Sequence, residues 1–245
     1  MKKLILLAAT LLALNTGAAL AQNPGVNLSW NDCTASLGTN VFVTSACNSN
    51  TEAAKSLYGT FVLPPGGVPA LSGNDIVIDV LSCDATVPCW WNFTVAPRTL
   101  GYSMNFDTVC PDAAGVGILD YWGTIPGGPG GGAIAQLVPA RPRVIRIIGT
   151  VAVDEAKAQP VPDGVEVYSF TFRLKFDATV GTCTGCATHA DISLSRIQVY
   201  QVGLPSIDLT TPSTWNVVGW QGGYPNCITD PVANKTWGAV KALYR

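Results

Sequence analysis

The chain has 245 residues, of which 12 % are charged and 48 % hydrophobic, and its 14 basic residues are slightly outnumbered by 16 acidic ones. This apolar content argues against a disordered chain, and the lack of a basic excess argues against nucleic acid as a partner. The length accommodates one large all-β domain or two small ones. Glycine and proline are abundant while glutamate is rare, which favours strands and turns over helices.

The first 21 residues have the three-part pattern of a secretory signal peptide. Lys2 and Lys3 form the basic part, residues 4–14 form an apolar core too short to span a bilayer, and residues 19–21 read Ala-Leu-Ala, a cleavage pattern. We therefore expect the mature chain, residues 22–245, to be secreted, periplasmic or at the cell surface. No segment of it is apolar for long enough to form a transmembrane anchor.

Stretches rich in apolar and β-branched residues predict the first strands. They are two short edge strands at Leu28–Asn31 and Val41–Thr44, and longer strands at Leu57–Leu63, Ile76–Leu81 and Trp90–Ala96. The glycine-rich residues 127–132 either separate two halves of the chain or form a surface loop. We favour the loop, because such loops are common in β-sandwiches, and so expect one domain over residues 22–245.

The clearest strands follow this loop, at Arg143–Val153 and Val165–Phe176. The first has one apolar face, made of Ile145, Ile147, Val151 and Val153. The second has an apolar face made of Tyr168, Phe170, Phe172, Leu174 and Phe176, and a polar face made of Ser169, Thr171, Arg173 and Lys175. One buried and one solvated face is typical of antiparallel sheets. Residues 154–164 between them fit a long hairpin loop.

The strand expected at Ile192–Val202 changes phase in its middle, because its apolar positions are even-numbered at first and odd-numbered later. A β-bulge near Ser195 or Arg196 would return both halves to the core face. At the end of the chain, Thr236–Arg245 carries an apolar stripe at helical spacing and predicts a short helix. The pattern as a whole predicts an all-β protein, an antiparallel β-sandwich of immunoglobulin-like or jelly-roll-like type with a short C-terminal helix.

All eight cysteines lie in the exported part of the chain, where thiols oxidise, so we expect four disulfides. Eight cysteines allow about 105 connectivities. Sequence separation favours Cys33 with Cys47, Cys110 with Cys83 or Cys89, and Cys227 with Cys183 or Cys186.

The Cys183–Cys186 motif, with His189 three residues later, raises other chemistries. Zinc would be bound by these three residues with Cys227 as a fourth ligand, whereas a redox motif would open a helix and a haem site would need histidine directly after the second cysteine. Structural disulfides are the better interpretation in an exported chain, so we expect no metal and no cofactor. His189 is the only histidine and has no identifiable nucleophile beside it, so we interpret it as an exposed polar residue.

Two groups of aspartates leave a secreted hydrolase open as an alternative. They are Asp75, Asp79 and Asp84, and Asp107, Asp112 and Asp120. A glycosidase needs two carboxylates roughly 5–10 Å apart in a cleft, and no spacing in either group singles out such a pair.

Tryptophans leave a carbohydrate-binding module open as another alternative, because exposed rings stack on sugar faces. The candidates are Trp90, Trp91, Trp122, Trp215 and Trp220. Two or three of them would have to be exposed on one surface. Trp90 and Trp91, adjacent on an expected strand, should point to opposite faces. We interpret these rings as mostly core residues.

The mature chain also resembles a group of secreted bacterial proteins of unknown function. The stretches that carry this resemblance are Leu28–Cys33, Ala46–Asn48, Phe61–Gly66, Trp90–Trp91, Asp120–Gly123, the Cys183–Cys186 loop and the ending Thr236–Arg245. The resemblance implies no particular activity. We therefore predict a secreted, non-catalytic protein with a structural or binding role in the envelope or extracellular space. Its partner would be a glycan or an envelope protein.

Overall fold

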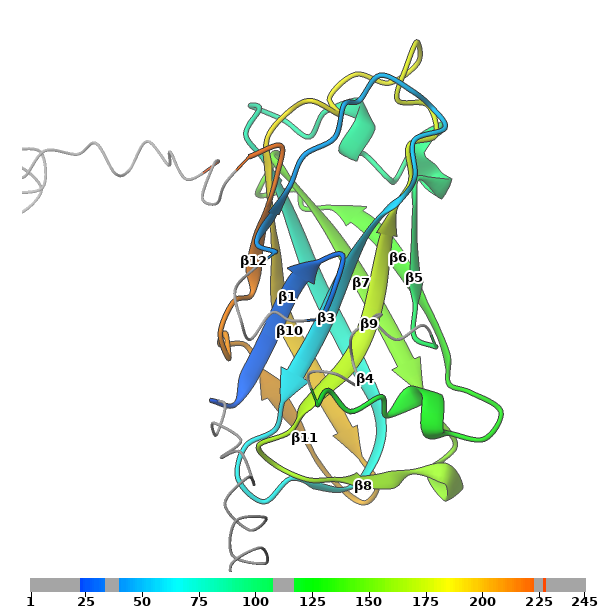
Figure 1. Cartoon of the computed structure of the whole chain (residues 1–245), viewed down its shortest axis with the longest axis vertical. Coiled ribbons are helices and arrows are strands. Elements are labelled where there is room, and N and C mark those ends of the chain that lie inside the picture. The colour runs from blue at the N-terminus through cyan, green and yellow to red at the C-terminus, as the bar shows by residue number, and fades with distance from the viewer. Residues whose placement is uncertain (1–22, 34–39, 108–116, 223–226, 228–245) are drawn as a thin grey trace, which may run out of the picture.

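The computed structural model describes residues 23–33, 40–107, 117–222 and 227, and these are mostly β-structure in two sheets (Figure 1). The four-stranded sheet has the order β1 (Gly25–Trp30), β3 (Lys55–Val62), β9 (Glu166–Leu174), β5 (Tyr102–Asn105). The eight-stranded sheet contains β2 (Phe42–Val43), β12 (Val217–Trp220), β10 (Ala190–Gln201), β4 (Val68–Ser82), β7 (Val144–Ala152) and β6 (Gly130–Leu137), in that order. Beside them, β11 (Leu204–Leu209) pairs with β10 and β8 (Gln159–Val161) pairs with β4.

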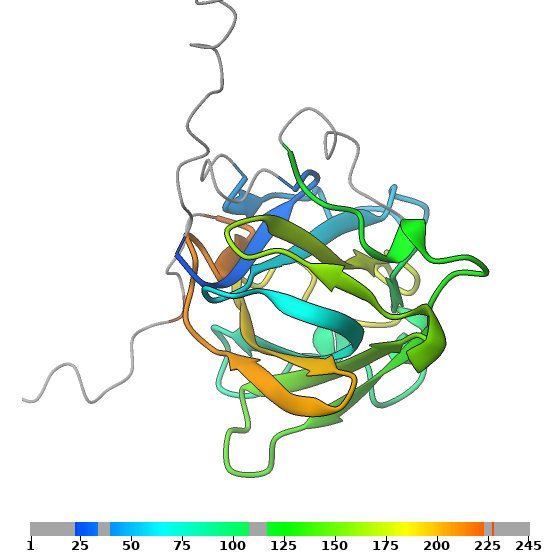
Figure 2. The same ribbon diagram turned by 90° about the horizontal axis from the view of Figure 1, so that it is seen from below.

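All strand pairs are antiparallel except the short pair of β12 with β2. The remaining elements are single 3-10 turns: η3 (Cys89–Trp91), η4 (Arg98–Leu100), η5 (Trp122–Thr124) and η6 (Glu155–Lys157). Figure 2 shows the two sheets as layers, and side chains from both belong to one buried apolar cluster. A buried hydrogen bond also joins the layers, from Asn74 Nδ2 of β4 to Ser169 Oγ of β9, at 3.0 Å.

Most of the predicted strands are confirmed. The expected edge strands correspond to β1 and β2, and the longer ones correspond to β3, β4, β7, β9 and β10. The apolar face of β7 is buried at Ile145, Ile147 and Val151. The predicted phase change in β10 is a bulge, because the register with β4 shifts between Leu194 and Arg196. Apolar residues on both sides of the bulge are buried as a result.

Strand β9 also contains a bulge, which the sequence pattern did not reveal. Phe170 pairs with Gly59, but Tyr168 pairs with Thr60, so one residue of β9 is extra. Because Gly59 and Thr60 point to opposite faces, Tyr168 and Phe170 do so too. Tyr168 is therefore buried on the outer face of the sheet, while Ser169 bonds inward to Asn74.

The prediction of one buried and one wet side for this strand was consequently wrong for its first half. Ser169 and Thr171 are both buried, and only Arg173 on the polar face is exposed. The outer edge of this half is bonded to an irregular segment, since Leu119 N donates to Glu166 O and Tyr168 N donates to Leu119 O. On the inner face the Phe170 ring fills the space above Gly59, where an added Cβ would lie 2.0 Å from Phe170 Cε1.

Three further expectations need correction. Residues 90–96 form no strand, because the chain turns through η3 there. The glycine-rich residues 127–132 are not only a loop, since the last three of them open strand β6. Residues 154–164 are not a hairpin loop, because β7 and β9 belong to different sheets and the connection crosses between them. The predicted signal peptide and the predicted helix at Thr236–Arg245 lie outside the described residues.

Candidate functional site

Three disulfides join parts of the chain that are far apart in sequence: Cys47–Cys186, Cys83–Cys227 and Cys89–Cys183. Cys33 is disulfide-bonded as well, and Cys110 lies outside the described residues. The expectation of disulfides is confirmed, but the three expected pairings were wrong. Sequence separation was a poor guide here, because antiparallel pairing brings together residues that are 94 to 144 positions apart.

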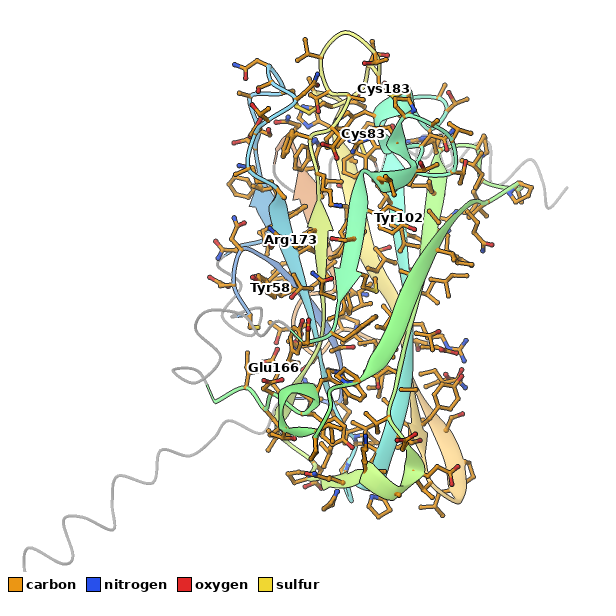
Figure 3. All side chains as sticks on the ribbon, turned by 90° about the vertical axis from the view of Figure 1, so that its right-hand side faces the viewer. Tyr58, Cys83, Tyr102, Glu166, Arg173 and Cys183 are labelled. Carbon is orange, nitrogen blue, oxygen red and sulfur yellow. A yellow bond between two sulfur atoms is a disulfide. The ribbon has the colours of Figure 1, made fainter. Side chains whose placement is uncertain are left out.

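The three bridges lie at one end of the molecule. Strand register shows this, because Ser82 and Trp220 both pair with Ala190, and Val43 pairs with Trp220. The cysteines follow or precede these strand ends by a few residues. Figure 3 shows Cys83 and Cys183 together at this end, with Glu166 toward the other. Two of the bridges connect the loops 44–54, 83–101 and 175–189, and the third joins the second of these loops to Cys227. We call these three loops the pinned end.

A cluster of buried tryptophans lies beneath these loops. Trp90 and Trp220 are stacked with ring centroids 5.3 Å apart, and Trp91 meets both rings edge-on at 4.9 and 5.7 Å. Trp30 reaches Trp220 from β1 at 5.9 Å. The indole nitrogens are tied to the same region, since Trp90 donates to Thr179 Oγ1 and Trp220 donates to Cys186 O. The loops therefore rest on a close-packed aromatic floor.

Arg98 is a fully buried charge within this floor. Its guanidinium lies 4.6 Å above the Trp90 ring and 5.6 Å from the Phe93 ring. It donates hydrogen bonds to Trp90 O at 2.8 Å, Lys175 O at 2.9 Å and Asp177 O at 2.5 Å. Desolvation by burial lowers the pKa of Arg98 to about 10, against the attraction of Asp177. Arg98 thus ties loop 83–101 to the end of β9 through backbone carbonyls.

Sequence reasoning missed Arg98 altogether. A signal was present, because it is the only charged residue between Asp84 and Asp107 and lies close to two tryptophans and a phenylalanine. A lone charge in such an apolar stretch is either exposed or fully satisfied by hydrogen bonds.

The proposed stacking aromatics are mostly unavailable to a ligand. Trp90, Trp91, Trp122 and Trp220 are fully buried, and only Trp215 is exposed, at 41 %. The expectation that Trp90 and Trp91 face opposite sides of a strand was also wrong, because both belong to η3 and point into the core. The five candidates therefore do not form the exposed ring platform that a carbohydrate-binding module needs, and their interpretation as mostly core residues fits the structure.

The pinned end presents a surface that mixes apolar and polar groups. Leu100 is 74 % exposed, and Val95 and Val180 are exposed as well. The Asn50 side chain accepts a hydrogen bond from Val180 N and donates one to Val180 O, which ties loop 44–54 to loop 175–189. His189 is exposed, as expected of a solvated loop residue.

The metal and redox interpretations of the Cys183–Cys186 motif are contradicted. Cys183, Cys186 and Cys227 are each oxidised with a different partner, so they do not converge as thiolates on one ion. Within the described part of the chain, no group of three or more His, Cys, Asp or Glu residues is placed to hold a metal ion.

The carboxylates of β4 are already engaged with neighbouring side chains. Asp79 is buried and receives two hydrogen bonds from Arg146, at 2.7 and 2.9 Å. Asp75 accepts hydrogen bonds from Tyr200 Oη at 2.6 Å and Thr150 Oγ1 at 2.7 Å. Four residues apart on one strand, the two carboxylates are about 13 Å from each other, beyond the separation used by glycosidases.

The other aspartate candidates also occupy structural positions. Asp84 accepts a hydrogen bond from Thr188 Oγ1, and Asp120, which precedes η5, accepts one from Gly123 N of that turn. Asp107 interacts electrostatically with Tyr168, and Asp112 lies outside the described residues. Burial is the main cause that raises the pKa of Tyr168, and Asp107 and Asp120 add to it.

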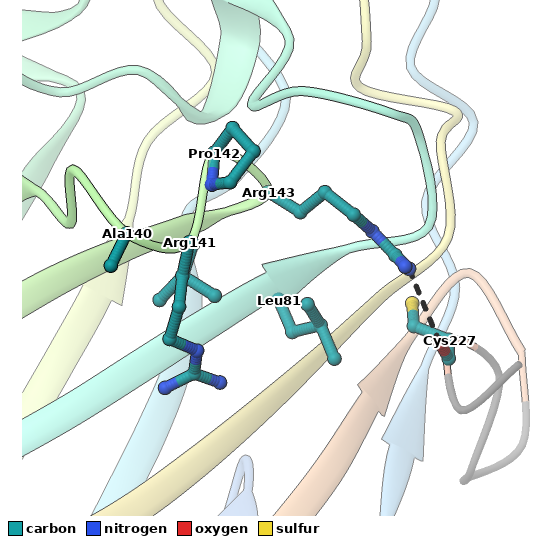
Figure 4. Close-up of a pocket in the computed structure, with 7 residues that line it drawn as sticks. Leu81, Ala140, Arg141, Pro142, Arg143 and Cys227 are labelled. Atoms are coloured by element: carbon teal, nitrogen blue, oxygen red, sulfur yellow. Dashed lines mark hydrogen bonds between the residues drawn. The ribbon is translucent and has the colours of Figure 1, made fainter. Parts of the chain in front are cut away.

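A pocket of about 470 Å³ lies where β7 begins, and Figure 4 shows its lining. Its two cationic residues are Arg141 and Arg143. Arg143 donates to Ser82 O and Cys227 O, and Arg141 reaches Asp79 Oδ2 at 3.4 Å. Both guanidinium groups are engaged by the protein, and Figure 4 shows them pointing in different directions. The described lining therefore contains no convergent set of groups for catalysis.

No family model matches the chain, and no curated protein or solved structure matches it either. The resemblance to secreted bacterial proteins remains a prediction from the sequence. Among the residues described, no helix is both long and apolar enough to span a membrane.

Proposed function

We propose that this chain is an exported, non-catalytic binding protein whose recognition surface is the pinned end. The observation that carries this proposal is the placement of three disulfides at one end of the two sheets, over a floor of buried tryptophans. Loops fixed in this way lose little conformational entropy on binding, so their contacts contribute more fully to affinity.

The exposed side chains of the pinned end suit recognition. Leu100, Val95 and Val180 offer apolar area, and asparagine and threonine side chains beside them offer hydrogen bonds. Such a mixture is typical of surfaces that bind proteins or polysaccharides. The partner we propose is therefore an envelope protein or a glycan that contacts this end, without a flat platform of stacked rings.

We further propose that residues 22–245 form a single β-sandwich domain of immunoglobulin-like or jelly-roll-like type. One apolar cluster shared by both sheets supports this proposal, as does the long reach of the three bridges across the chain. Export through the predicted signal peptide accounts for the oxidised cysteines, since disulfides persist in oxidising compartments. Sequencing the secreted form from its N-terminus should give Gln22 as the first residue.

Binding can be tested with the mature, oxidised chain. Cellulose, chitin, peptidoglycan and solubilised envelope protein are incubated with it in separate pull-downs, and the same preparation is assayed for glycosidase and esterase turnover. We expect retention on one of these materials and no turnover. Leu100→Asp should weaken retention, whereas Leu204→Asp, at an exposed leucine of β11, should not. Turnover abolished by an Asp→Asn substitution would replace this proposal with the secreted hydrolase.

A further inference from the structure

Strand β6 forms an edge of the eight-stranded sheet, and its sequence lacks the residues that usually protect an edge. Its eight residues, Gly130–Leu137, contain no charge and no proline, and Ile134 is 63 % exposed. Proteins normally shield long edge strands with charges, prolines, bulges or a covering segment, because an open edge pairs with other strands. Every residue of β6 is exposed or half-buried.

The other described edges are protected or short. The edge of β1 is bonded to an irregular segment, since Val26 N donates to Thr211 O and Leu28 N donates to Trp215 O. At the far side of the eight-stranded sheet, β2 has only two residues. At the edge of the four-stranded sheet, β5 has four. Among the described edges, that of β6 therefore stands out by its length and its neutrality. Strand β5 and the residue after it approach this edge, since Tyr102 Oη donates to Ala133 O at 3.4 Å and a Cβ added at Gly131 would lie 2.6 Å from Phe106 Cε2.

Backbone geometry shows which groups of β6 point outward. Val138 N donates to Val144 O of the β7 side, so the even-numbered residues before it face β7 as well. The odd-numbered residues, Gly131 to Leu137, then present their N–H and C=O groups away from the sheet. Ala133 O fits this assignment, since it accepts a hydrogen bond from Tyr102 Oη rather than from β7. A carbonyl oxygen accepts two hydrogen bonds, so Ala133 O keeps one acceptor site for a partner strand beside its contact with Tyr102.

We propose that β6 pairs antiparallel with β6 of a second copy of this chain, with Ile134 on the twofold axis. In this register Ala133 pairs with Ala135 of the second copy and Gly131 pairs with its Leu137, which matches all outward groups. The register shifted by two would place Ile134 against Gly132 and bring Pro129 into the ladder. Pairing of this kind would continue the eight-stranded sheet across the axis.

Side chains on the outer face of the sheet support this occupant. Ile134 pairs with Ile148 of β7, which pairs with Val77 of β4, so an apolar row runs across the sheet and ends at the exposed Ile134. In the proposed dimer this row meets the same row of the second copy at the twofold axis, so Ile134 of one copy covers the exposed side of Ile134 of the other. Gly132 faces open space, so the long Gln136 of the other copy meets no obstacle there.

Charged side chains lie near both ends of β6. Arg141, just beyond its last residue, reaches Asp79, and Asp154, beside its first residue, is bonded to Lys157. Each end therefore carries an ion pair, and the antiparallel arrangement rests on the match of outward backbone groups and not on charge. The inference goes beyond the proposed function, because it concerns a different surface and does not depend on turnover or on the pinned end.

Cross-linking of the mature chain tests the register. Ile134→Cys should give a covalent dimer on mild oxidation, because residues on the axis have Cβ atoms about 4.5–5.5 Å apart. Gln136→Cys is the matched control, since its two copies would lie about 13 Å apart in this register. Equal cross-linking of both variants, or of neither, would overturn the proposal.

Sedimentation of the uncross-linked chain gives an independent readout. The unmodified chain should dimerise with rising concentration, Ile134→Lys should be monomeric, and Leu204→Lys should dimerise as before. An equimolar mixture of Ile134→Lys and Ile134→Glu should restore the dimer, which an unfolded variant would not do. A wild-type chain that stays monomeric throughout would overturn the second copy as occupant and direct the search to a strand from another protein.

Discussion

At the pinned end, three disulfides, a tryptophan cluster and the buried Arg98 fix the loops in place. At the opposite end, hydrogen bonds fix the loops. That opposite end comprises residues 63–67, 117–128 and 153–164, and none of the three described bridges reaches it. Tyr121 is its main anchor, donating to Leu71 O and accepting from Gln159 N. Buried rings occur at both ends, since Trp122 packs on Tyr121 at the opposite end, but the three described disulfides are all at the pinned end. This covalent difference is the basis for proposing that recognition takes place at the pinned end.

Reduction should produce the largest effect and should separate the two ends. Each disulfide removed is expected to lower the free energy of unfolding by about 2–5 kcal/mol. Thermal unfolding with and without reductant measures the total, and intact mass verifies how many bridges were present. Hydrogen exchange supplies the comparison, because amides of the pinned loops should lose protection before the Gln159 amide does. Equal loss at both ends would show that the bridges stabilise the fold as a whole and not one end of it.

Arg98→Met should destabilise the pinned end strongly, although it truncates no large core ring. It leaves the carbonyls of Trp90, Lys175 and Asp177 without their buried donor, and each such loss costs about 1 kcal/mol or more, for a total near 3 kcal/mol. Chemical denaturation measures the change. Arg173→Met, at an exposed arginine of β9, is the control and should change the free energy of unfolding by less than about 0.5 kcal/mol.

Tyr121→Phe probes the opposite end and should cost less, about 1–2 kcal/mol. The substitution keeps the buried ring but removes the hydroxyl that links Leu71 O and Gln159 N, which leaves a buried carbonyl and an amide less well satisfied. The same denaturation experiment measures it. A loss as large as that from Arg98→Met would mean that hydrogen bonds secure the opposite end as firmly as the pinned end is secured.

The sequence predicted the strands well where side-chain alternation was regular. β7, β9 and β10 were located, and the bulge in β10 followed from the change in parity of its apolar positions. The bulge in β9 left no such trace, because Tyr168 is apolar enough to be buried on either face and Ser169 finds Asn74 inside. Strands β6, β11 and β12 were missed, since glycines in β6, mixed polarity in β11 and the short length of β12 hide the alternation of apolar and polar residues.

The candidate site was harder to predict than the fold, for physical reasons. Disulfide partners depend on which strand ends meet, and that depends on a topology that no local pattern encodes. Trp90 and Trp91 were assigned to a strand because they are bulky and apolar, yet the chain turns at Pro88 and both rings enter the core. Arg98 is stabilised by carbonyls from three separate places, so nothing adjacent in the sequence marks it as buried.

Alkaline pH offers a gentler probe of the opposite end. Burial raises the pKa of Tyr121 above the ordinary tyrosine value, partly offset by the hydrogen bond from Gln159. Below a pH of about 10 the hydroxyl is neutral in both folded and unfolded chains, so its contribution is fully present. As the pH rises further, the unfolded chain ionises first and the free energy of unfolding falls. Denaturation at several pH values should show this decline, and Tyr121→Phe should make it shallower; an identical slope would mean that Tyr121 does not contribute.

Leu100→Ser should have the smallest effect on stability and yet be informative about function. Leu100 is 74 % exposed at the pinned end, so losing its side chain should change the free energy of unfolding by no more than about 0.5 kcal/mol. If the pinned end is the recognition surface, retention on the bound material should still fall, because apolar contact with the partner is lost while the loops keep their shape. Leu204→Ser, at an exposed leucine of β11, should alter neither quantity. Unchanged retention in Leu100→Ser, with melting temperature also unchanged, would remove this part of the surface from recognition and leave the disulfides with a purely stabilising role.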